Sequence, residues 1–368
     1  MLKNLAVTAT RLRHVIVMLV AGIGFAGVTG IPVDAGRRGS EDTRSQNAAG
    51  QIPQGSVWVV NRDRGELTVF DARTGDVLAT KLVGAGAHDI CISEHAGKAY
   101  IAAETINAVT AVDIRTLEAE SISVAPLPHH VEPSPDGRTI YVSLASHTAT
   151  SGTPALAVID TRDHGVSYMP TSVNPAARSH APFVSHDGET VYVAHDLGDE
   201  VAGLSTETGS IDFTVRPIVR AEEAVATRTG RELWVSSRGD GTVKRIDLAT
   251  HAISASIPVG VQPESVMLTP SEHTLVVSLR GSPAMLAFVD TRDATLLGTV
   301  AIGGPGTFGD LAVMTDDGRY VFATFDAGTG GTGGVAVVDV RAREVVSTWA
   351  YPGTGRPHGV WFSRRQLR

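Results

Sequence analysis

Cysteine is almost absent from this chain, with Cys91 alone among 368 residues. One thiol can form neither an internal disulfide nor a cysteine-based zinc site, so both are excluded. The chain also lacks an excess of basic residues, because its formal net charge is −8 and its pI is near 5.9. Without a basic face or a stripe of aromatic side chains, the protein is not expected to bind nucleic acid.

Several motifs of enzymes and cofactor-binding proteins are missing too. The sequence has no Gly-x-Ser-x-Gly elbow, no nucleophilic Cys/His arrangement, no c-type haem motif and no EF-hand loop. The glycine-rich run 328–334 resembles a phosphate loop only in composition, since it lacks the Lys-Ser/Thr ending and a helix after it. Neither haem nor a nucleotide cofactor is therefore expected.

Long hydrophobic runs are scarce, and the clear one, residues 15–31, lies near the N-terminus. Lys3, Arg11 and Arg13 precede this run, and Val33-Asp34-Ala35 offers a small-x-small cleavage site after it. This pattern predicts a secretory signal peptide over residues 1–35, with an uncleaved membrane anchor as the alternative. Residues 36–55 are polar and predict a flexible leader. We expect an exported protein that leaves the membrane after signal cleavage.

What the chain has in abundance is repetition. Each repeat has an apolar strand that ends in Asp, and these residues are Asp71, Asp113, Asp160, Asp247, Asp290 and Asp339. In the fourth repeat Ser205 takes the place of the Asp. The intervals between successive positions are 42 to 49 residues. Every unit contains four short runs of β-branched or aromatic residues separated by turn residues. Four strands in a repeat of this length are typical of a propeller blade.

The two ends of the repeat region complete each other. The first strand-like run, residues 57–60, lacks the segment that precedes such a run in the other repeats, and the last run, 357–363, is that segment. The C-terminal strand is therefore predicted to complete the N-terminal blade and close the ring. The sequence predicts an all-β, seven-bladed β-propeller with four-stranded blades over residues 56–368.

The repeat also resembles a known family. Its segments are similar to the Ser-Pro-Asp-Gly, Tyr-Val-x-Asn and Val-x-Val-Ile-Asp pieces of the YVTN-type repeat: Ser134-Pro135-Asp136-Gly137, Tyr141-Val142, Trp58-Val59-Val60-Asn61 and Ala157-Val158-Ile159-Asp160. Over residues 56–368 the chain resembles the secreted YncE-like and surface-layer propeller proteins. The resemblance implies a propeller fold and says little about function, because that family includes both binding proteins and enzymes.

Every repeat carries a His or an acidic residue five positions before a Ser or Thr. In chain order these residues are His88, His129, His180, Glu222, Glu264, Asp310 and His358. On a propeller they would share one level of the axis, at the face where loops from all blades converge. We predict a metal site for Zn²⁺, Mn²⁺, Fe²⁺ or Cu²⁺, built from the four histidines and Asp310, with Glu222 or Glu264 as a general base. A polar pocket without metal and a structural hydrogen-bond belt are the alternatives.

A second set of polar residues lies in the loops between the second and third strands. Arg62, Arg238 and Arg280 hold that place in three blades. Because a guanidinium binds carboxylate or phosphate in bidentate fashion, these arginines and His195 are candidates to hold a small anionic ligand above the ring. The alternative is that the arginines are solvated rim charges paired with acidic neighbours in their own loops. His130 is expected at the surface or in a turn.

Three functions fit these features. The first is an exported protein that binds a divalent metal or a small, anionic ligand on its axis. The second is a metal-dependent enzyme, either an oxidoreductase or a lactonase-type hydrolase, that uses the same cluster. The third is an interaction scaffold whose flat face docks a protein or a cell-wall component.

Overall fold

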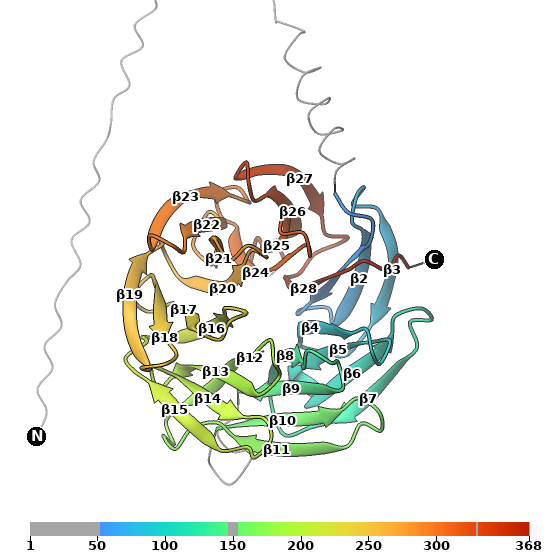
Figure 1. Ribbon diagram of the computed structural model, residues 1–368. Coiled ribbons are helices and arrows are strands. Elements are labelled where there is room, and N and C mark those ends of the chain that lie inside the picture. Colours follow the sequence, from blue (N-terminus) through green and yellow to red (C-terminus); the bar gives the residue numbers. More distant parts are fainter. Residues whose placement is uncertain (1–51, 146–153, 329, 368) are drawn as a thin grey trace, which may run out of the picture. The chain divides into compact units, whose positions relative to one another are not determined.

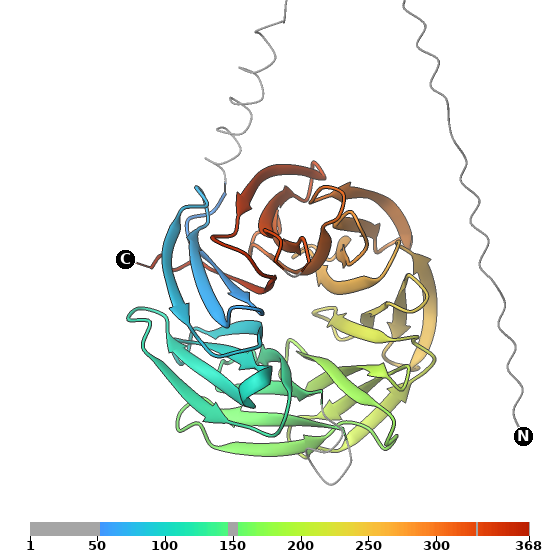
Figure 2. The ribbon, with the colours of Figure 1, turned by 180° about the vertical axis from the view of Figure 1, so that it is seen from behind.

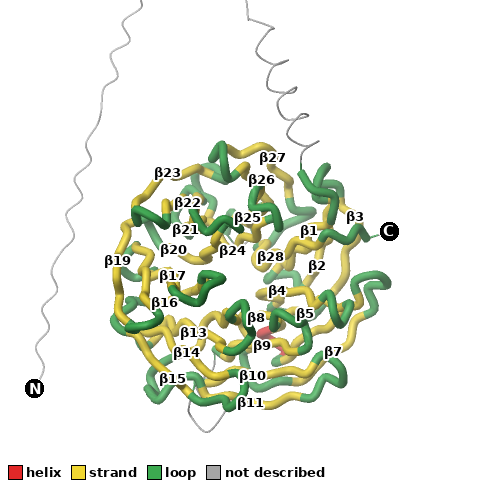
Figure 3. Tube along the Cα trace, viewed as in Figure 1, coloured by secondary structure: helices red, strands yellow, loops and turns green. Residues whose placement is uncertain are grey.

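The computed structural model describes residues 52–145, 154–328 and 330–367. In these residues the chain forms 28 β-strands and one short 3-10 helix, η1 (Glu104–Ile106). The strands group into seven four-stranded sheets, which surround a central axis (Figure 1 and Figure 2). Strands and short loops alternate throughout, as Figure 3 shows. The predicted all-β, seven-bladed propeller is confirmed.

The four strands of each blade follow one another from the axis outward. Blades 1 to 3 contain β28 (Pro357–Ser363), β1 (Ser56–Asn61), β2 (Glu66–Asp71) and β3 (Val77–Leu82); β4 (Ala87–Ser93), β5 (Lys98–Ala103), β6 (Ala108–Asp113) and β7 (Ala119–Ser123); and β8 (Pro128–Pro133), β9 (Thr139–Leu144), β10 (Ala155–Asp160) and β11 (Val166–Pro170). Blades 4 and 5 contain β12 (Arg178–Val184), β13 (Thr190–Leu197), β14 (Glu200–Ser205) and β15 (Ile211–Val215); and β16 (Ala221–Ala226), β17 (Glu232–Ser237), β18 (Thr242–Asp247) and β19 (Ala252–Pro258). Blades 6 and 7 contain β20 (Pro263–Leu268), β21 (Thr274–Leu279), β22 (Met285–Asp290) and β23 (Thr295–Ala301); and β24 (Phe308–Met314), β25 (Tyr320–Asp326), β26 (Gly334–Asp339) and β27 (Glu344–Ala350).

Blade 1 joins the two ends of the described chain. Strand β28 pairs with β1 in antiparallel fashion, with Phe362 opposite Val57 and Val360 opposite Val59. These four side chains are buried in one hydrophobic cluster. In Figure 1 the red β28 therefore completes the sheet of the blue strands. The predicted closure by the C-terminal strand is confirmed.

The repeated Asp has a local structural reason. Asp71 ends β2, and its Oδ1 accepts the backbone N–H groups of Arg73 and Thr74 at 2.8 and 3.1 Å. The other five repeated aspartates also accept backbone N–H bonds from the turn that follows them. Asp is favoured at this place because its short carboxylate satisfies the turn backbone. In the fourth blade Ser205 Oγ accepts a single such bond, from Thr208.

Each innermost strand is irregular at the His or acidic position. The pairing with the second strand skips this residue and the one after it; in β8, for example, Pro128 and Val131 are paired with β9 but His129 and His130 are not. The other six blades show the same break at the same position. Because a bulge suspends the strict alternation of strand side chains, two consecutive residues can approach the axis.

Hydroxyl groups on the second strands hold these irregular segments. Ser236 Oγ accepts the N–H of Glu223 at 3.0 Å and donates to the carbonyl oxygen of Glu264 in the next blade at 2.6 Å. Ser143 and Thr324 likewise donate to a backbone carbonyl of the next blade. Since innermost strands of adjacent blades do not pair with each other, such bonds connect them around the axis.

Replacing Ser236 with Ala should lower the free energy of unfolding by about 1–3 kcal/mol, because a buried N–H and a buried carbonyl lose their partner. Urea unfolding followed by circular dichroism measures this loss. The exposed Ser123 of β7 supplies the matched control, Ser123→Ala, which should change stability by less than about 0.5 kcal/mol. Equal effects of the two substitutions would show that the hydroxyl does not stabilise the axis.

The N-terminal predictions fall largely outside the described residues. The predicted signal peptide, 1–35, and most of the leader, 36–55, belong to this part of the chain. Of the leader, Ile52 is 1 % exposed and packs in the hydrophobic cluster of blades 1 and 7. Within the ranges that the structure describes, no helix has the length and apolar character needed to cross a membrane.

Candidate functional site

The seven predicted axial residues do come together, and six of them are buried. They lie on β28, β4, β8, β12, β16, β20 and β24, one in each blade. The histidines form a continuous arc: the ring centroid of His88 is 3.9 Å from that of His358 and 3.8 Å from that of His129, and His129 is 4.8 Å from His180. The carboxylates of Glu222, Glu264 and Asp310 occupy the other blades. We call these seven residues the axial ring.

Two arginines neutralise the acidic half of the axial ring. Arg238 Nη1 lies 3.1 Å from Glu222 Oε1 and 3.2 Å from Glu264 Oε2. Arg280 Nη1 lies 2.9 Å from Asp310 Oδ1 and 3.9 Å from Glu264 Oε1. Both guanidinium groups come from loops after the second strand, as predicted. They are not solvated rim charges, because their partners are the buried carboxylates of the axial ring.

Arg62 is engaged in a different way. Its Nη2 lies 2.7 Å from Oε2 of Glu104, a residue of η1 that the sequence analysis did not select. The other oxygen, Oε1, lies 2.5 Å from Nδ1 of His129. Glu104 thereby connects Arg62 to the histidine arc, and a carboxylate at Nδ1 leaves Nε2 of His129 as the nitrogen available to a ligand.

His195, predicted as a candidate to hold a ligand above the ring, does not lie at the mouth of the propeller. It is fully buried in blade 4, where its Nε2 is 3.0 Å from Thr171 Oγ1 and its Nδ1 is 3.9 Å from Glu200 Oε1. Glu200 is itself paired with Arg216. The hydrogen bond of His195 connects the second strand of blade 4 to Thr171, in the link before β12.

His130 is the axial residue that sequence reasoning missed. It is 3 % exposed, so its assignment to the surface or a turn is wrong. Its ring centroid lies 4.8 Å from His129, 4.7 Å from His180 and 5.1 Å from His88. Asp89 Oδ2 is 3.1 Å from Nδ1 of His130, and Nε2 has no partner among the described residues. The repeated break in the innermost strands was the missing signal, because strict alternation would point His130 away from the axis.

Burial and neighbouring charges give the histidines of the axial ring different pKa values. Burial, and then the adjacent imidazoles, lower the pKa of His88 and His129 well below the usual value. Burial would also lower the pKa of His180, but Glu222, with its Oε2 at 2.8 Å from Nε2, overcomes this and raises it to about 9. Burial would raise the pKa of Glu222, yet His180 and Arg238 lower it to about 2. The arc therefore has a neutral part and a cationic end next to the carboxylates.

Glu222 is consequently a poor general base, since an ionised carboxylate with so low a pKa holds a proton weakly. Burial raises the pKa of Asp310 to about 7 in spite of Arg280. His358 Nε2 lies 3.2 Å from Asp310 Oδ1. The sequence predicted one metal site from the four histidines and Asp310. In the structure, His358 and Asp310 pair with each other.

A cavity of about 200 Å³ adjoins the axial ring. Asp89, His130, Glu132 and Glu223 supply its polar lining, and most of the remaining wall is apolar. Burial and the nearby Asp89 raise the pKa of Glu132 to about 8. His130, whose Nε2 has no partner among the described residues, therefore lines a space with room for a small molecule.

Two groups in the described part of the chain have the geometry of metal ligands. In the first, one nitrogen each of His88, His129 and His130 lie within 4.8 Å of one another. In the second, the same holds for ligand atoms of His180, Glu222 and Glu264. The first set is purely imidazole, and the second mixes nitrogen and oxygen.

Comparison with known proteins supports the propeller fold and does not assign a function. No protein-family model and no curated protein matches the sequence. The periplasmic gluconolactonase PpgL of Pseudomonas aeruginosa matches with a TM-score of 0.63, at 15 % identity, over 84 % of this chain and 98 % of its own. Hydrazine synthase of Kuenenia stuttgartiensis gives a TM-score of 0.63, at 16 % identity, over 82 % and 96 %. The dihydro-heme d1 dehydrogenase NirN, in complex with DHE, gives 0.59, at 18 % identity, over 84 % and 75 %.

Proposed function

We propose that this protein binds one divalent transition metal ion on its axis through His88, His129 and His130. The observation that carries the proposal is the orientation of two of these imidazoles. Glu104 holds Nδ1 of His129 and Asp89 holds Nδ1 of His130, so that Nε2 of each is free. Metal-binding histidines are typically held by a carboxylate on the opposite nitrogen, which fixes the tautomer and the ring.

The all-imidazole group is a better cation site than the second group. Glu222 and Glu264 already share the guanidinium of Arg238, whose positive charge would repel a metal ion at the same place. Arg62 also places a positive charge near His88 and His129, whose pKa values it lowers, but Glu104 pairs with its guanidinium. Three imidazole ligands suit Zn²⁺, Cu²⁺ or Fe²⁺ better than Mn²⁺, which prefers oxygen ligands.

A metal-dependent enzyme is the second candidate function, and the cavity of about 200 Å³ beside the axial ring favours it. His130 lines both the proposed metal site and this cavity, so a water or substrate could reach the ion from there. A catalytic ion needs such an open position beside three protein ligands. Glu132 and Glu223 line the same cavity and are further candidates for a general base beside Glu264. Oxidation and lactone-type hydrolysis are both compatible with this arrangement.

An exported location is part of the proposal. It is supported by the predicted signal peptide and is compatible with the periplasmic gluconolactonase that shares the fold. The scaffold function, with a protein or cell-wall partner, is the alternative if no metal binds.

Elemental analysis of protein purified without chelator or affinity tag should find close to one equivalent of a transition metal per chain. His130→Ala should lose that metal, because it removes a ligand, whereas the exposed His186→Ala, close in sequence to His180, should retain it. Glu264→Gln tests the second group and should also retain the metal. The absence of metal from wild-type protein, even after incubation with divalent ions and gel filtration, would refute the proposal. Loss in Glu264→Gln with retention in His130→Ala would move the site to the second group.

A further inference from the structure

Large apolar side chains are exposed on the face of the propeller where the axial ring opens. In five consecutive blades, the link entering the innermost strand or the first residue of that strand presents one: Leu127, Val173, Val219, Val261 and Phe308, which are 42, 88, 38, 65 and 40 % exposed. We call these five residues the apolar collar. Among the described residues, the turns of the opposite face and the first residue of each strand that follows them present one large exposed apolar side chain, Val77 of β3, which is 46 % exposed.

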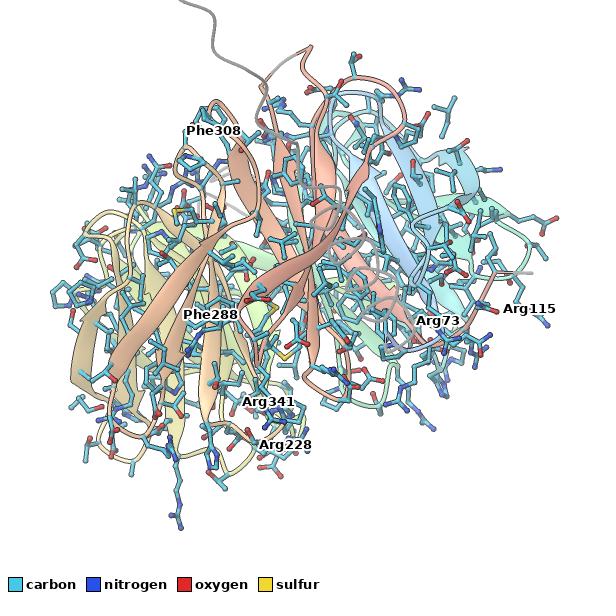
Figure 4. All side chains as sticks on the ribbon, turned by 90° about the horizontal axis from the view of Figure 1, so that it is seen from above. Arg73, Arg115, Arg228, Phe288, Phe308 and Arg341 are labelled. Carbon is cyan, nitrogen blue, oxygen red and sulfur yellow. The ribbon has the colours of Figure 1, made fainter. Side chains whose placement is uncertain are left out.

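Exposed arginines occur on both faces: Arg216 and Arg220, in the link between β15 and β16 on the face of the axial ring, have side chains that are each 49 % exposed. Figure 4 shows Phe308 at one end of the propeller and Arg228 and Arg341, from turns of blades 5 and 7, at the other. Both arginines are exposed. A soluble protein normally scatters exposed apolar residues, so their repeated place on one face indicates a binding surface.

A groove joins two members of the apolar collar to two arginines. It measures about 440 Å³, and Val261, Phe308, Arg280, Arg356 and Asp326 are among its lining residues. Its volume is in the range of small-molecule sites. Because the groove lies over blades 6, 7 and 1, it is distinct from the three-imidazole group of blades 2 and 3.

The arginines of this groove keep nitrogens available for a ligand. Arg280 uses Nη1 for both of its carboxylate contacts, and Nε and Nη2 have no partner in the described residues. Arg356 uses Nε and Nη2 on Asp63 Oδ1, at 2.9 and 2.6 Å, which leaves Nη1. Free guanidinium nitrogens beside an apolar wall fit a carboxylate attached to an apolar body.

Asp326 limits the charge of the ligand. It is 3 % exposed, and its Oδ1 accepts the N–H of Gly328 at 2.7 Å. Each of the two guanidinium groups already pairs with a carboxylate outside the groove, Asp310 for Arg280 and Asp63 for Arg356, while Asp326 adds a negative charge to the lining itself. A monoanion is therefore favoured over a phosphate dianion or a dicarboxylate, each of which would bring a second negative charge towards Asp326.

We propose that the groove binds a small organic monocarboxylate with an apolar body. The carboxylate lies against Arg280 and Arg356, and the body lies between Val261 and Phe308. This inference goes beyond the metal proposal, because none of the three imidazoles lines the groove. If the protein is an enzyme, the groove supplies the chemical class of its substrate at a place next to the axial ring.

Isothermal titration calorimetry with phenylpropionate tests the proposal. Phenylpropionamide, which lacks the charge, and propionate, which lacks the ring, should each bind at least about tenfold more weakly. Arg356→Gln and Phe308→Ser should weaken phenylpropionate binding by at least about tenfold, because each removes one of the two recognised features. The matched control on the opposite face, Arg341→Gln, should bind like the wild type.

The same titration on His130→Ala separates this proposal from the metal proposal. Unchanged affinity in that variant supports the groove, whether or not the wild-type protein holds a metal. Loss of binding in His130→Ala would place the carboxylate on the axial ion and overturn the groove. Equal affinity for acid and amide, equal affinity in Phe308→Ser, or no binding of phenylpropionate by the folded protein would overturn it as well.

Discussion

A chain that ends at Arg356 will not form a folded propeller. This truncation removes β28, and with it Val360 and Phe362, which are 5 and 6 % exposed in the cluster of blades 1 and 7. Burial of two such side chains contributes about 3–6 kcal/mol, at about 1.5–3 kcal/mol each. The paired backbone of β1 would also become an exposed sheet edge. Since whole domains are stable by only about 5–15 kcal/mol, we expect insoluble or unfolded protein.

Circular dichroism, gel filtration and limited proteolysis measure this outcome. The matched control is a chain that ends at Ser363, which retains all of β28 and loses only contacts such as the bond from Ser56 Oγ to the carbonyl of Arg365. It should fold and show a melting temperature close to that of the full chain. If the chain ending at Arg356 showed a cooperative melt, closure through β28 would not be required for stability.

Replacing Arg238 with Met should lower the free energy of unfolding by about 3–5 kcal/mol at neutral pH. The side chain of Arg238 is 17 % exposed, and those of its partners Glu222 and Glu264 are 0 and 3 % exposed. Removing one member of a buried ionic group is strongly destabilising, because Glu264 then keeps, among the described residues, only Arg280, at 3.9 Å, as a cationic partner. Met keeps most of the apolar stem, so that the loss reports the charge rather than the packing.

A divalent ion should restore part of this stability. Without Arg238, the ligand atoms of His180, Glu222 and Glu264 surround a place where a cation is favoured. Zn²⁺ or Mn²⁺ at 100 times its dissociation constant would stabilise the variant by about 2.7 kcal/mol. Urea unfolding with and without metal measures both effects, and the exposed Arg228→Met is the control. A loss no larger than that of the control would show that the guanidinium does not hold the acidic half together.

The fold could be predicted because its signals are local and periodic. The turn after Asp71 depends on residues within three positions, and the same chemistry recurs in five other blades. Ser134 Oγ, five positions after His129, accepts the N–H of Thr139 across the first turn of its blade, so the spacing from the axis to that turn is also local. The closure by β28 was predictable because an incomplete first repeat and an extra last segment are visible in the order of the residues.

The candidate site was predictable only in part. Repetition identified the axial ring, but partners inside it depend on side chains from different blades. Glu104 reaches His129 from η1 of the preceding blade, and Arg238 reaches Glu264 of the following one. His195 illustrates the opposite error: it is only one residue from the position of the predicted mouth, yet it lies in the interior of blade 4. One residue along a strand changes the face to which a side chain points.

The sequence by itself determined the number of blades, their closure and the level at which histidines and carboxylates meet, because these follow from spacing along the chain. Tertiary structure alone decided which of those groups are neighbours. The break in each innermost strand brought His130 to the axis beside His129, and the arrangement of the blades placed Arg238 between two carboxylates. Charge and hydrogen bonding act over a few ångströms through space, and these distances exist only once the ring is closed.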